Sequence, residues 1–258
     1  MARVIAICNQ KGGVGKSTTA VNVASYIALT GKRTVLVDLD PQGNASTACG
    51  VGRGEAEYTI YNVLIDGFAA EQAIRKTAIE QLDIIPSKLE LAGAEPVMAT
   101  MESRETILRR ACEPLRAKYE FIIFDCPPSL GLLTVNALVA ADSTMIPVQC
   151  EYFALEGLNS LMQAVRLVKQ SLNPSLRVGG IVLTMTDFRA TLAREVAEEV
   201  RGFFKSLVFN TAIPRNIRLA ESPSFGKPIC LYDPHSTGAL AYQLLTQEVL
   251  TKEEESPA

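Results

Sequence analysis

The sequence predicts an α/β fold, built as a mostly parallel, twisted sheet with helices on both faces. Short runs of apolar and β-branched residues alternate with longer helical patterns, which is the order expected of strand–helix–strand units. These runs are continuously apolar, as in strands that are buried on both faces of a parallel sheet. Right-handed crossovers between such strands place helices on both sides. Hydrophobic residues make up 48% of the chain and charged residues 21%, so a large core can form.

Each expected strand is an apolar run bounded by polar or turn-forming residues. The expected strands span residues 4–8, 34–39, 82–85, 121–124, 143–148, 178–184 and 207–210. The expected helices span residues 16–30, 59–66, 104–117, 132–141, 154–171, 191–206 and 236–249. A length of 258 residues suits one α/β domain, which we place at residues 1–250. The last eight residues, TKEEESPA, are polar and acidic, and we expect a flexible acidic tail at residues 251–258.

Composition argues against several classes of protein. The formal net charge is −3, so nothing global demands a nucleic-acid partner, and any DNA contact must come from a local patch. The chain has one histidine, and no two of its six cysteines form a CxxC pair, so we expect reduced thiols and no Cys/His metal site. No stretch approaches the roughly 20 apolar residues of a membrane span. We therefore expect a soluble, cytoplasmic protein.

The strongest motif is a glycine-rich turn between the first expected strand and the first expected helix. Residues 9–18 read NQKGGVGKST, and the three glycines let the backbone approach a phosphate without Cβ clashes. Successive N–H groups at a helix N-terminus form an anion cradle. Lys16 can reach the β- and γ-phosphates of a nucleotide, and the Ser17 hydroxyl is placed to bind Mg²⁺. The predicted nucleotide-binding residues are Gly12, Gly13, Val14, Gly15, Lys16, Ser17 and Thr18.

This turn departs from the usual phosphate-loop pattern in two ways. The usual pattern begins with glycine at the position of Gln10, and here a second lysine, Lys11, lies five residues before Lys16. Lys11 has no evident role within its own subunit.

Two later strands end in carboxylates. Asp38 and Asp40 lie in VDLDPQGN, and FIIFD ends in Asp125 and is followed by CPPS. The carboxyl ends of parallel strands share one edge of the sheet, where ligands bind. Phosphoryl transfer needs a carboxylate near Mg²⁺ and a group that orients the attacking water. We expect Asp125 to hold Mg²⁺. No histidine, cysteine or lysine general base is evident nearby, which favours a slow, regulated ATPase.

These segments resemble one group of proteins. KGGVGKST resembles the deviant Walker A motif of the ParA/MinD group of P-loop ATPases, whereas VDLDPQGN and DCPPS resemble switch I and switch II of ParA/Soj proteins. The runs at 148–158, VQCEYFALEGL, and at 213–228, IPRNIRLAESPSFGKP, are similar to chromosomal members. The resemblance covers residues 4 to about 250 and implies a P-loop fold of the deviant Walker A type. It also implies the cofactors ATP and Mg²⁺.

The resemblance assigns roles to individual residues. Lys11 would reach the nucleotide of the partner subunit in an ATP-dependent homodimer, and would act there as an arginine finger does. Asp40 would position the attacking water, and Asp38 would support the Mg²⁺ shell, although a capping role for Asp38 stays open. Met185, Pro214 and Asn216 fall where the family holds adenine. Lys11, Lys16 and Asp40 are the expected catalytic residues.

The family also implies partners. Its members are DNA-segregation ATPases that bind DNA non-specifically and respond to a ParB/Spo0J-type activator, so we expect a nucleoid-associated protein. Arg189 and Arg218 match positions used for DNA contact, although basic residues in this region could equally form a solvated face with local ion pairs. The alternatives are a relative that positions another cargo, a MinD-like membrane switch and an iron–sulfur carrier. The acidic C-terminus argues against the membrane switch, and the absence of CxxC argues against the carrier.

Overall fold

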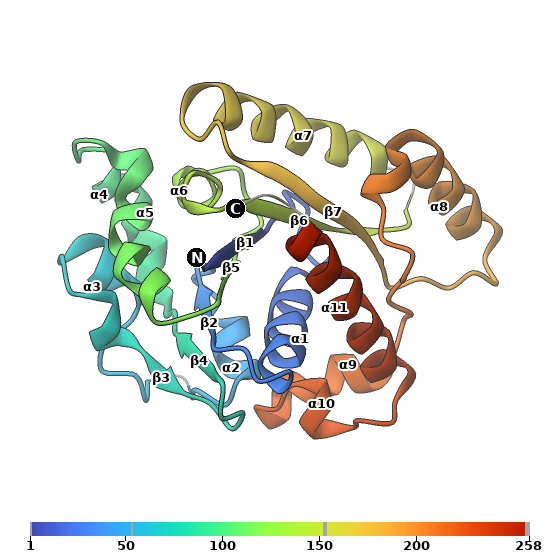
Figure 1. Cartoon of the computed structure of the whole chain (residues 1–258), viewed down its shortest axis with the longest axis horizontal. Helices are drawn as coiled ribbons and strands as arrows, with labels where there is room; N and C mark the ends of the chain where they lie inside the picture. The colour runs from blue at the N-terminus through green and yellow to red at the C-terminus, as the bar shows by residue number, and fades with distance from the viewer. Residues whose placement is uncertain (1, 53, 152–153, 256–258) are drawn as a thin grey trace.

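The computed structural model describes residues 2–52, 54–151 and 154–255, and it contains one seven-stranded sheet (Figure 1). The strand order is β3-β4-β2-β5-β1-β6-β7, and every neighbouring pair is parallel except β3 with β4. The strands are β1 Arg3–Ile7, β2 Thr34–Asp38, β3 Arg75–Lys76, β4 Leu82–Ile85, β5 Phe121–Asp125, β6 Ser143–Gln149 and β7 Arg177–Thr184. The predicted fold class is confirmed.

Helices cover both faces of the sheet, and alternation along β1 shows how the two faces are packed. Val4, Ala6 and Cys8 join one buried cluster, whereas Ile5 and Ile7 join the other. The first cluster lies under α3 Ile60–Ile65, α4 Ala94–Met98, α5 Ile107–Cys112, α6 Leu132–Ala140, α7 Ala154–Ser171 and α8 Thr191–Phe204. The second lies under α1 Lys16–Leu29, α2 Asn44–Ala48, α9 Ile217–Glu221, α10 Ile229–Tyr232 and α11 Thr237–Glu255.

The strand predicted at 207–210 is wrong, one observed edge strand was not predicted, and the helix predicted at 104–117 is incomplete. Residues 207–210 are not a strand, because a single parallel bridge between Ile181 and Val208 follows a 3₁₀ turn at Lys205–Leu207. The short edge strand β3 was not predicted, since its Arg–Lys sequence has no apolar run. The helix expected at 104–117 is interrupted: α5 is flanked by 3₁₀ turns at Arg104–Thr106 and Glu113–Ala117, the second of which contains a proline near its start.

The expectation of a flexible tail from residue 251 is wrong for residues 251–255, which form the last turn of α11. Glu253 is only 3% exposed. Its Oε1 accepts a hydrogen bond from the Ser143 hydroxyl at 2.8 Å, and its Oε2 pairs with Arg177. A polar segment can be buried here because the Glu253 carboxylate has polar partners on β6 and β7. The sequence does not indicate this pairing, since the partners lie far away along the chain. Residues 256–258 lie outside the described residues.

The cysteines are free thiols, as the sequence indicates. Cys8 and Cys126 directly follow the paired residues Ile7 and Asp125 of neighbouring strands, and their sulfur atoms lie 2.9 Å apart. None of the described helices is long and apolar enough to cross a membrane.

Replacing Glu253 by alanine should destabilise the fold by about 2 kcal/mol, because the substitution leaves Ser143 and Arg177 without their shared partner. Urea unfolding would measure the free energy of unfolding. Glu254→Ala is the matched control, since Glu254 is exposed on the same helical turn and its loss should have little effect. Equal stability of the two variants would contradict the anchoring role of Glu253.

Candidate functional site

The phosphate loop leaves β1 and enters α1 at the carboxyl edge of the sheet. Gly13 and Gly15 adopt left-handed backbone conformations, with φ of 74° and 86°, which glycine adopts without strain. Gly15 is the N-cap of α1 and has no side chain to cap it, so the first N–H groups of this helix are available to an anion. The loop is braced from β7, because the Thr184 hydroxyl donates a hydrogen bond to the Val14 carbonyl at 2.8 Å.

The two lysines of the loop lie in different surroundings. Lys16 is 6% exposed, and its Nζ donates to the Lys11 carbonyl at 3.0 Å. Burial lowers the pKa of Lys16, while Asp125 and Asp40 oppose that shift. The Lys11 side chain is half exposed and pairs with Glu151 at 2.5 Å. Lys11 thus has a partner within its own subunit that no sequence pattern indicated, because Glu151 lies 140 residues away; its cross-subunit role stays a prediction.

Strand register brings two of the predicted carboxylates together. Asp38 of β2 is the register partner of Asp125 of β5, and the buried Asp125 carboxylate lies near Lys16 and Ser17. Neither oxygen of Asp125 has a hydrogen-bond partner among the described residues. Desolvation raises the pKa of Asp125 well above its ordinary value, and Asp38 raises it further. The Ser17 hydroxyl, which does not reach hydrogen-bond geometry, and the Lys16 ammonium lower it.

Asp125 passes a physical test for a cation ligand. A buried carboxylate without donors is costly, and a divalent cation is the partner that satisfies it. No group of three or more His, Cys, Asp or Glu side chains in the described ranges is arranged to hold a metal by itself. Mg²⁺ takes one or two protein ligands and completes its shell with phosphate oxygens and water.

Asp38 differs from Asp125 because its oxygens are engaged. Oδ1 accepts from the Asp40 backbone N–H at 3.1 Å, and Oδ2 accepts from the Ser46 N–H at 2.8 Å and the Ser46 hydroxyl at 2.7 Å. Burial raises the pKa of Asp38 to about 6, against the effect of these hydrogen bonds. Of the two roles considered for Asp38, the geometry favours the cap: it holds α2 and the loop that carries Asp40.

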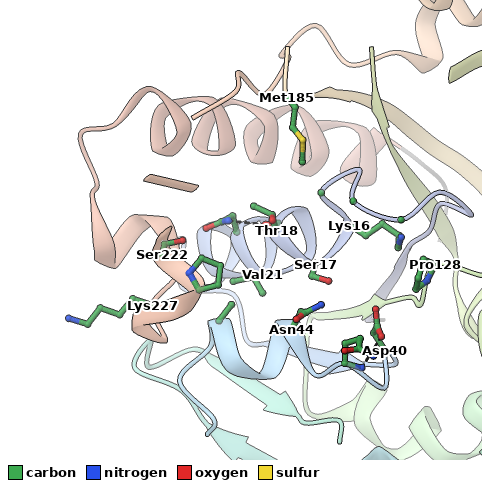
Figure 2. Close-up of a pocket in the computed structure, with 17 residues that line it drawn as sticks. Lys16, Ser17, Thr18, Val21, Asp40, Asn44, Pro128, Met185, Ser222 and Lys227 are labelled. Atoms are coloured by element: carbon green, nitrogen blue, oxygen red, sulfur yellow. Dashed lines mark hydrogen bonds between the residues drawn. The ribbon is translucent and has the colours of Figure 1, made fainter. Parts of the chain in front are cut away.

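Asp40 lies in the wall of a cavity of about 380 Å³ (Figure 2). The Gln42 backbone N–H donates to its Oδ1 at 2.9 Å, which fixes the carboxylate. Of the predicted residues, the same wall contains Gly12, Gly13, Gly15, Lys16, Ser17, Thr18 and Met185. Sequence reasoning missed Val21, Asn22, Gln42, Asn44, Ala48, Pro128, Ser222, Pro223 and Lys227. The positions of Gln42, Asn44 and Pro128 next to the predicted carboxylates were the available signal. Val14 is buried and does not line the cavity.

A second cavity of about 330 Å³ adjoins the first, and Gly15, Thr18 and Met185 line both. It brings together the three residues expected near adenine, Met185, Pro214 and Asn216. Met185 holds a left-handed backbone conformation, with φ of 50°, that is strained for a residue with a long side chain. The Asn216 side chain also caps α9, because its Oδ1 accepts from the Leu219 N–H at 3.2 Å.

Three arginines of the last third have partners within the chain. Arg189 forms a two-point contact with Asp187 at 2.7 and 2.8 Å and is otherwise exposed. Arg218 pairs with Glu221 at 3.0 Å and Asp233 at 3.4 Å. Arg201 donates to two backbone carbonyls, so it holds the turn at 209–210. The structure thus places Arg189 and Arg218 on the surface, each beside local carboxylates.

Comparison with known proteins shows the family to which the chain belongs. An AAA domain family model matches residues 2–178. The chain is 52% identical over 249 residues to the sporulation initiation inhibitor protein Soj of Bacillus subtilis, with 96% of this chain and 98% of that protein covered. It is 51% identical over 253 residues to the chromosome partitioning protein ParA of Myxococcus xanthus, with 98% and 89% covered.

A solved structure shares the fold as well. The cobyrinic acid a,c-diamide synthase from Mycobacterium smegmatis, crystallised with ADP and magnesium, superposes with a TM-score of 0.86 at 33% identity and covers 99% of this chain and 96% of that one. The Soj and ParA relatives are about half identical to this chain and align with nearly all of it, so the similarity extends well beyond the phosphate loop. The chain belongs to the ParA/Soj family of chromosome-partitioning ATPases.

Proposed function

We propose that this protein is an ATP- and Mg²⁺-dependent partitioning switch. It binds ATP, dimerises, binds DNA without sequence preference, and hydrolyses ATP slowly when a ParB/Spo0J-type partner stimulates it. In the cell it works in the cytoplasm on the nucleoid. The observation that carries the proposal is the Asp125 carboxylate, buried without a donor beside Lys16 and the uncapped N-terminus of α1. Such a site suits a polyphosphate with a divalent cation.

The residues of the site divide the work of phosphoryl transfer. The N–H groups of the loop and the Lys16 ammonium hold the phosphates, and burial strengthens their interaction with charge. Ser17 and Asp125 would hold Mg²⁺, which neutralises charge on the phosphates when bound. Asp40 faces the cavity from a loop that Asp38 pins, so it is the group placed to orient a water molecule. Among the described residues that line the cavity, Asp40 is the one carboxylate, and a single carboxylate at this point suits slow hydrolysis.

Lys11 supports the dimer step. Its ion pair with Glu151 joins two half-exposed side chains, and such surface pairs contribute little. Lys11 can therefore leave Glu151 for a phosphate of the partner subunit at small cost. A second lysine added in this way completes charge stabilisation only after dimerisation, as an arginine finger does.

Two features argue against the membrane switch and the iron–sulfur carrier. The end of α11 is anchored to the sheet through Glu253, which is unlike a membrane-binding amphipathic helix. Cys126 is buried against Cys8, away from a surface where a cluster could be shared between subunits.

Size-exclusion chromatography with light scattering tests the dimer step on Asp40→Ala, a variant expected to trap the ATP state. It should change from monomer to dimer only with ATP and Mg²⁺. Adding Lys11→Ala should abolish the dimer while ATP still binds, whereas adding Lys169→Ala, which removes an exposed lysine of α7, should not. A dimer that survives Lys11→Ala would refute the cross-subunit role of Lys11.

Asp125→Asn tests the cation site. The folded-state pKa of Asp125 is raised, so the wild-type protein loses stability as pH rises above about 4, where the unfolded carboxyl ionises. Asparagine does not ionise, so the Asp125→Asn variant does not lose this stability. At pH 7 without nucleotide its Tm should be higher, by roughly 2–4 °C per kcal/mol recovered. Adding Mg–ADP should raise the Tm of the wild type more than that of the variant.

The matched control for this test is Glu80→Gln, which neutralises an exposed carboxylate. Its Tm should follow the wild type at each pH and with Mg–ADP. An Asp125→Asn protein that gains as much from Mg–ADP as the wild type would contradict the assignment of Asp125 to Mg²⁺.

The double variant Arg189→Glu, Arg218→Glu tests the DNA surface. Both side chains are exposed, and their ion pairs are weak enough to exchange for phosphates. The ATP-bound double variant should lose DNA binding in a mobility shift at low salt and keep its ATP affinity. Arg201→Glu is an unsuitable control because it would break a turn, so Arg166→Glu, exposed on α7, serves instead. Unchanged DNA binding by the double variant would reject this surface.

A further inference from the structure

The helix that follows the Asp125 loop has no cap of its own. Gly131 is the N-cap of α6 and offers no side chain, although serine, threonine, aspartate or asparagine would normally accept a hydrogen bond from the first turn. The acceptor comes instead from α4: Oε1 of Glu95 accepts from the Leu133 backbone N–H at 2.9 Å, across 38 residues of chain. A carboxylate at a helix N-terminus also interacts favourably with the helix dipole.

A second observation shows that position 131 is adapted to this contact. The backbone of Gly131 has φ of −77° and ψ of −171°, which any residue can adopt, so its conformation does not require glycine. A side chain at this position would instead displace the Glu95 carboxylate. A Cβ at this position would lie 2.2 Å from Oε1 and 2.8 Å from the carboxyl carbon of Glu95. Glycine therefore leaves room for the Glu95 carboxylate, which occupies the place of a local cap.

The start of α6 is also the far end of the loop that begins at Asp125. The Thr134 hydroxyl, in the first turn of α6, donates to the Ser129 carbonyl at 2.7 Å and so ties that turn to the loop. Within the loop, Pro128 lines the 380 Å³ cavity, and its Cβ lies 3.9 Å from the position that a Cβ on Gly12 would take. A contact at Leu133 thus bears on a residue beside the phosphate loop.

The rest of α6 is held independently. Asn136 accepts from the Leu108 N–H at 3.1 Å and donates to the Arg104 carbonyl at 2.8 Å, so the body of the helix stays attached to its neighbours if the cap is lost. Helices α4, α5 and α6 lie together on one face of the sheet (Figure 1). Loss of the Glu95 contact would loosen the first turn and the loop, and would leave the helix in place.

We propose that Glu95 is a positioning residue for ATP hydrolysis, acting from outside the cavity through the N-terminus of α6 on the loop at residues 126–131. This inference rests on the proposed ATPase function. Nucleotide affinity comes mainly from the phosphate loop and α1, which Glu95 does not touch. Its loss should therefore lower kcat and leave the affinity for ADP nearly unchanged.

Four variants test this. Glu95→Ala should lower kcat about five- to tenfold and speed amide hydrogen exchange in the peptide at residues 129–136. The double variant Glu95→Ala, Gly131→Ser should recover most of the wild-type kcat and most of the protection from exchange. The space that Glu95 leaves accepts a serine, and the serine hydroxyl caps α6 locally. Gly131→Ser alone should displace the Glu95 carboxylate and replace its cap with the serine hydroxyl, so its kcat and its exchange should match those of the double variant. Glu102→Ala, an exposed acid after α4, is the matched control and should match the wild type.

Each result decides a separate question. Normal exchange and normal kcat in Glu95→Ala would overturn the proposal, as would a loss that Gly131→Ser fails to rescue. A parallel fall in ADP affinity would show a general structural effect and would overturn the positioning role. If the wild-type protein hydrolyses no ATP with any activator, the proposed function fails, and with it the catalytic role of Glu95. The exchange data would still decide whether Glu95 caps α6.

Discussion

The site depends on one electrostatic constraint, the placing of two carboxylates side by side at the buried ends of adjacent parallel strands. Asp38 and Asp125 are register partners in β2 and β5, and desolvation raises the pKa of both. The fold relieves this charge in different ways at the two positions. Asp38 receives three hydrogen bonds from its own chain, whereas neither oxygen of Asp125 has a partner among the described residues. One pair of strands thus carries a carboxylate that the chain satisfies and a carboxylate that it does not.

The two lysines of the phosphate loop show the same division. Lys16 is buried near the carboxylates, where charge interacts strongly, and its position is fixed by the Lys11 carbonyl. Lys11 stays at the surface in a weak ion pair with Glu151, so its side chain can change partners. A buried lysine suits the binding of nucleotide in every state of a switch, and an exposed lysine suits a contact that forms only after two subunits meet.

Carboxylates also hold the surrounding framework, at points remote in sequence. Glu253 joins the end of α11 to β6 and β7, and Glu95 joins α4 to the beginning of α6. In both cases a carboxylate joins a helix to a partner far along the chain. The Glu95 contact lies near the carboxyl edge of the sheet, so a residue outside the cavity can influence a loop that lines it, whereas Glu253 holds the opposite edge at the first residues of β6 and β7.

The fold class, six of the seven expected strands and the phosphate loop could be predicted from the sequence, because apolar periodicity and the glycine–lysine pattern are local properties of the chain. The same holds for Asp40 and Asp125, which directly follow or end apolar strands. Only the tertiary structure decided what each charged residue contacts. Register paired Asp38 with Asp125, folding brought Glu151 to Lys11, and Glu253 became buried within a segment that looks like a polar tail. Hydrogen bonds and ion pairs depend on distance in space, and a sequence records only distance along the chain.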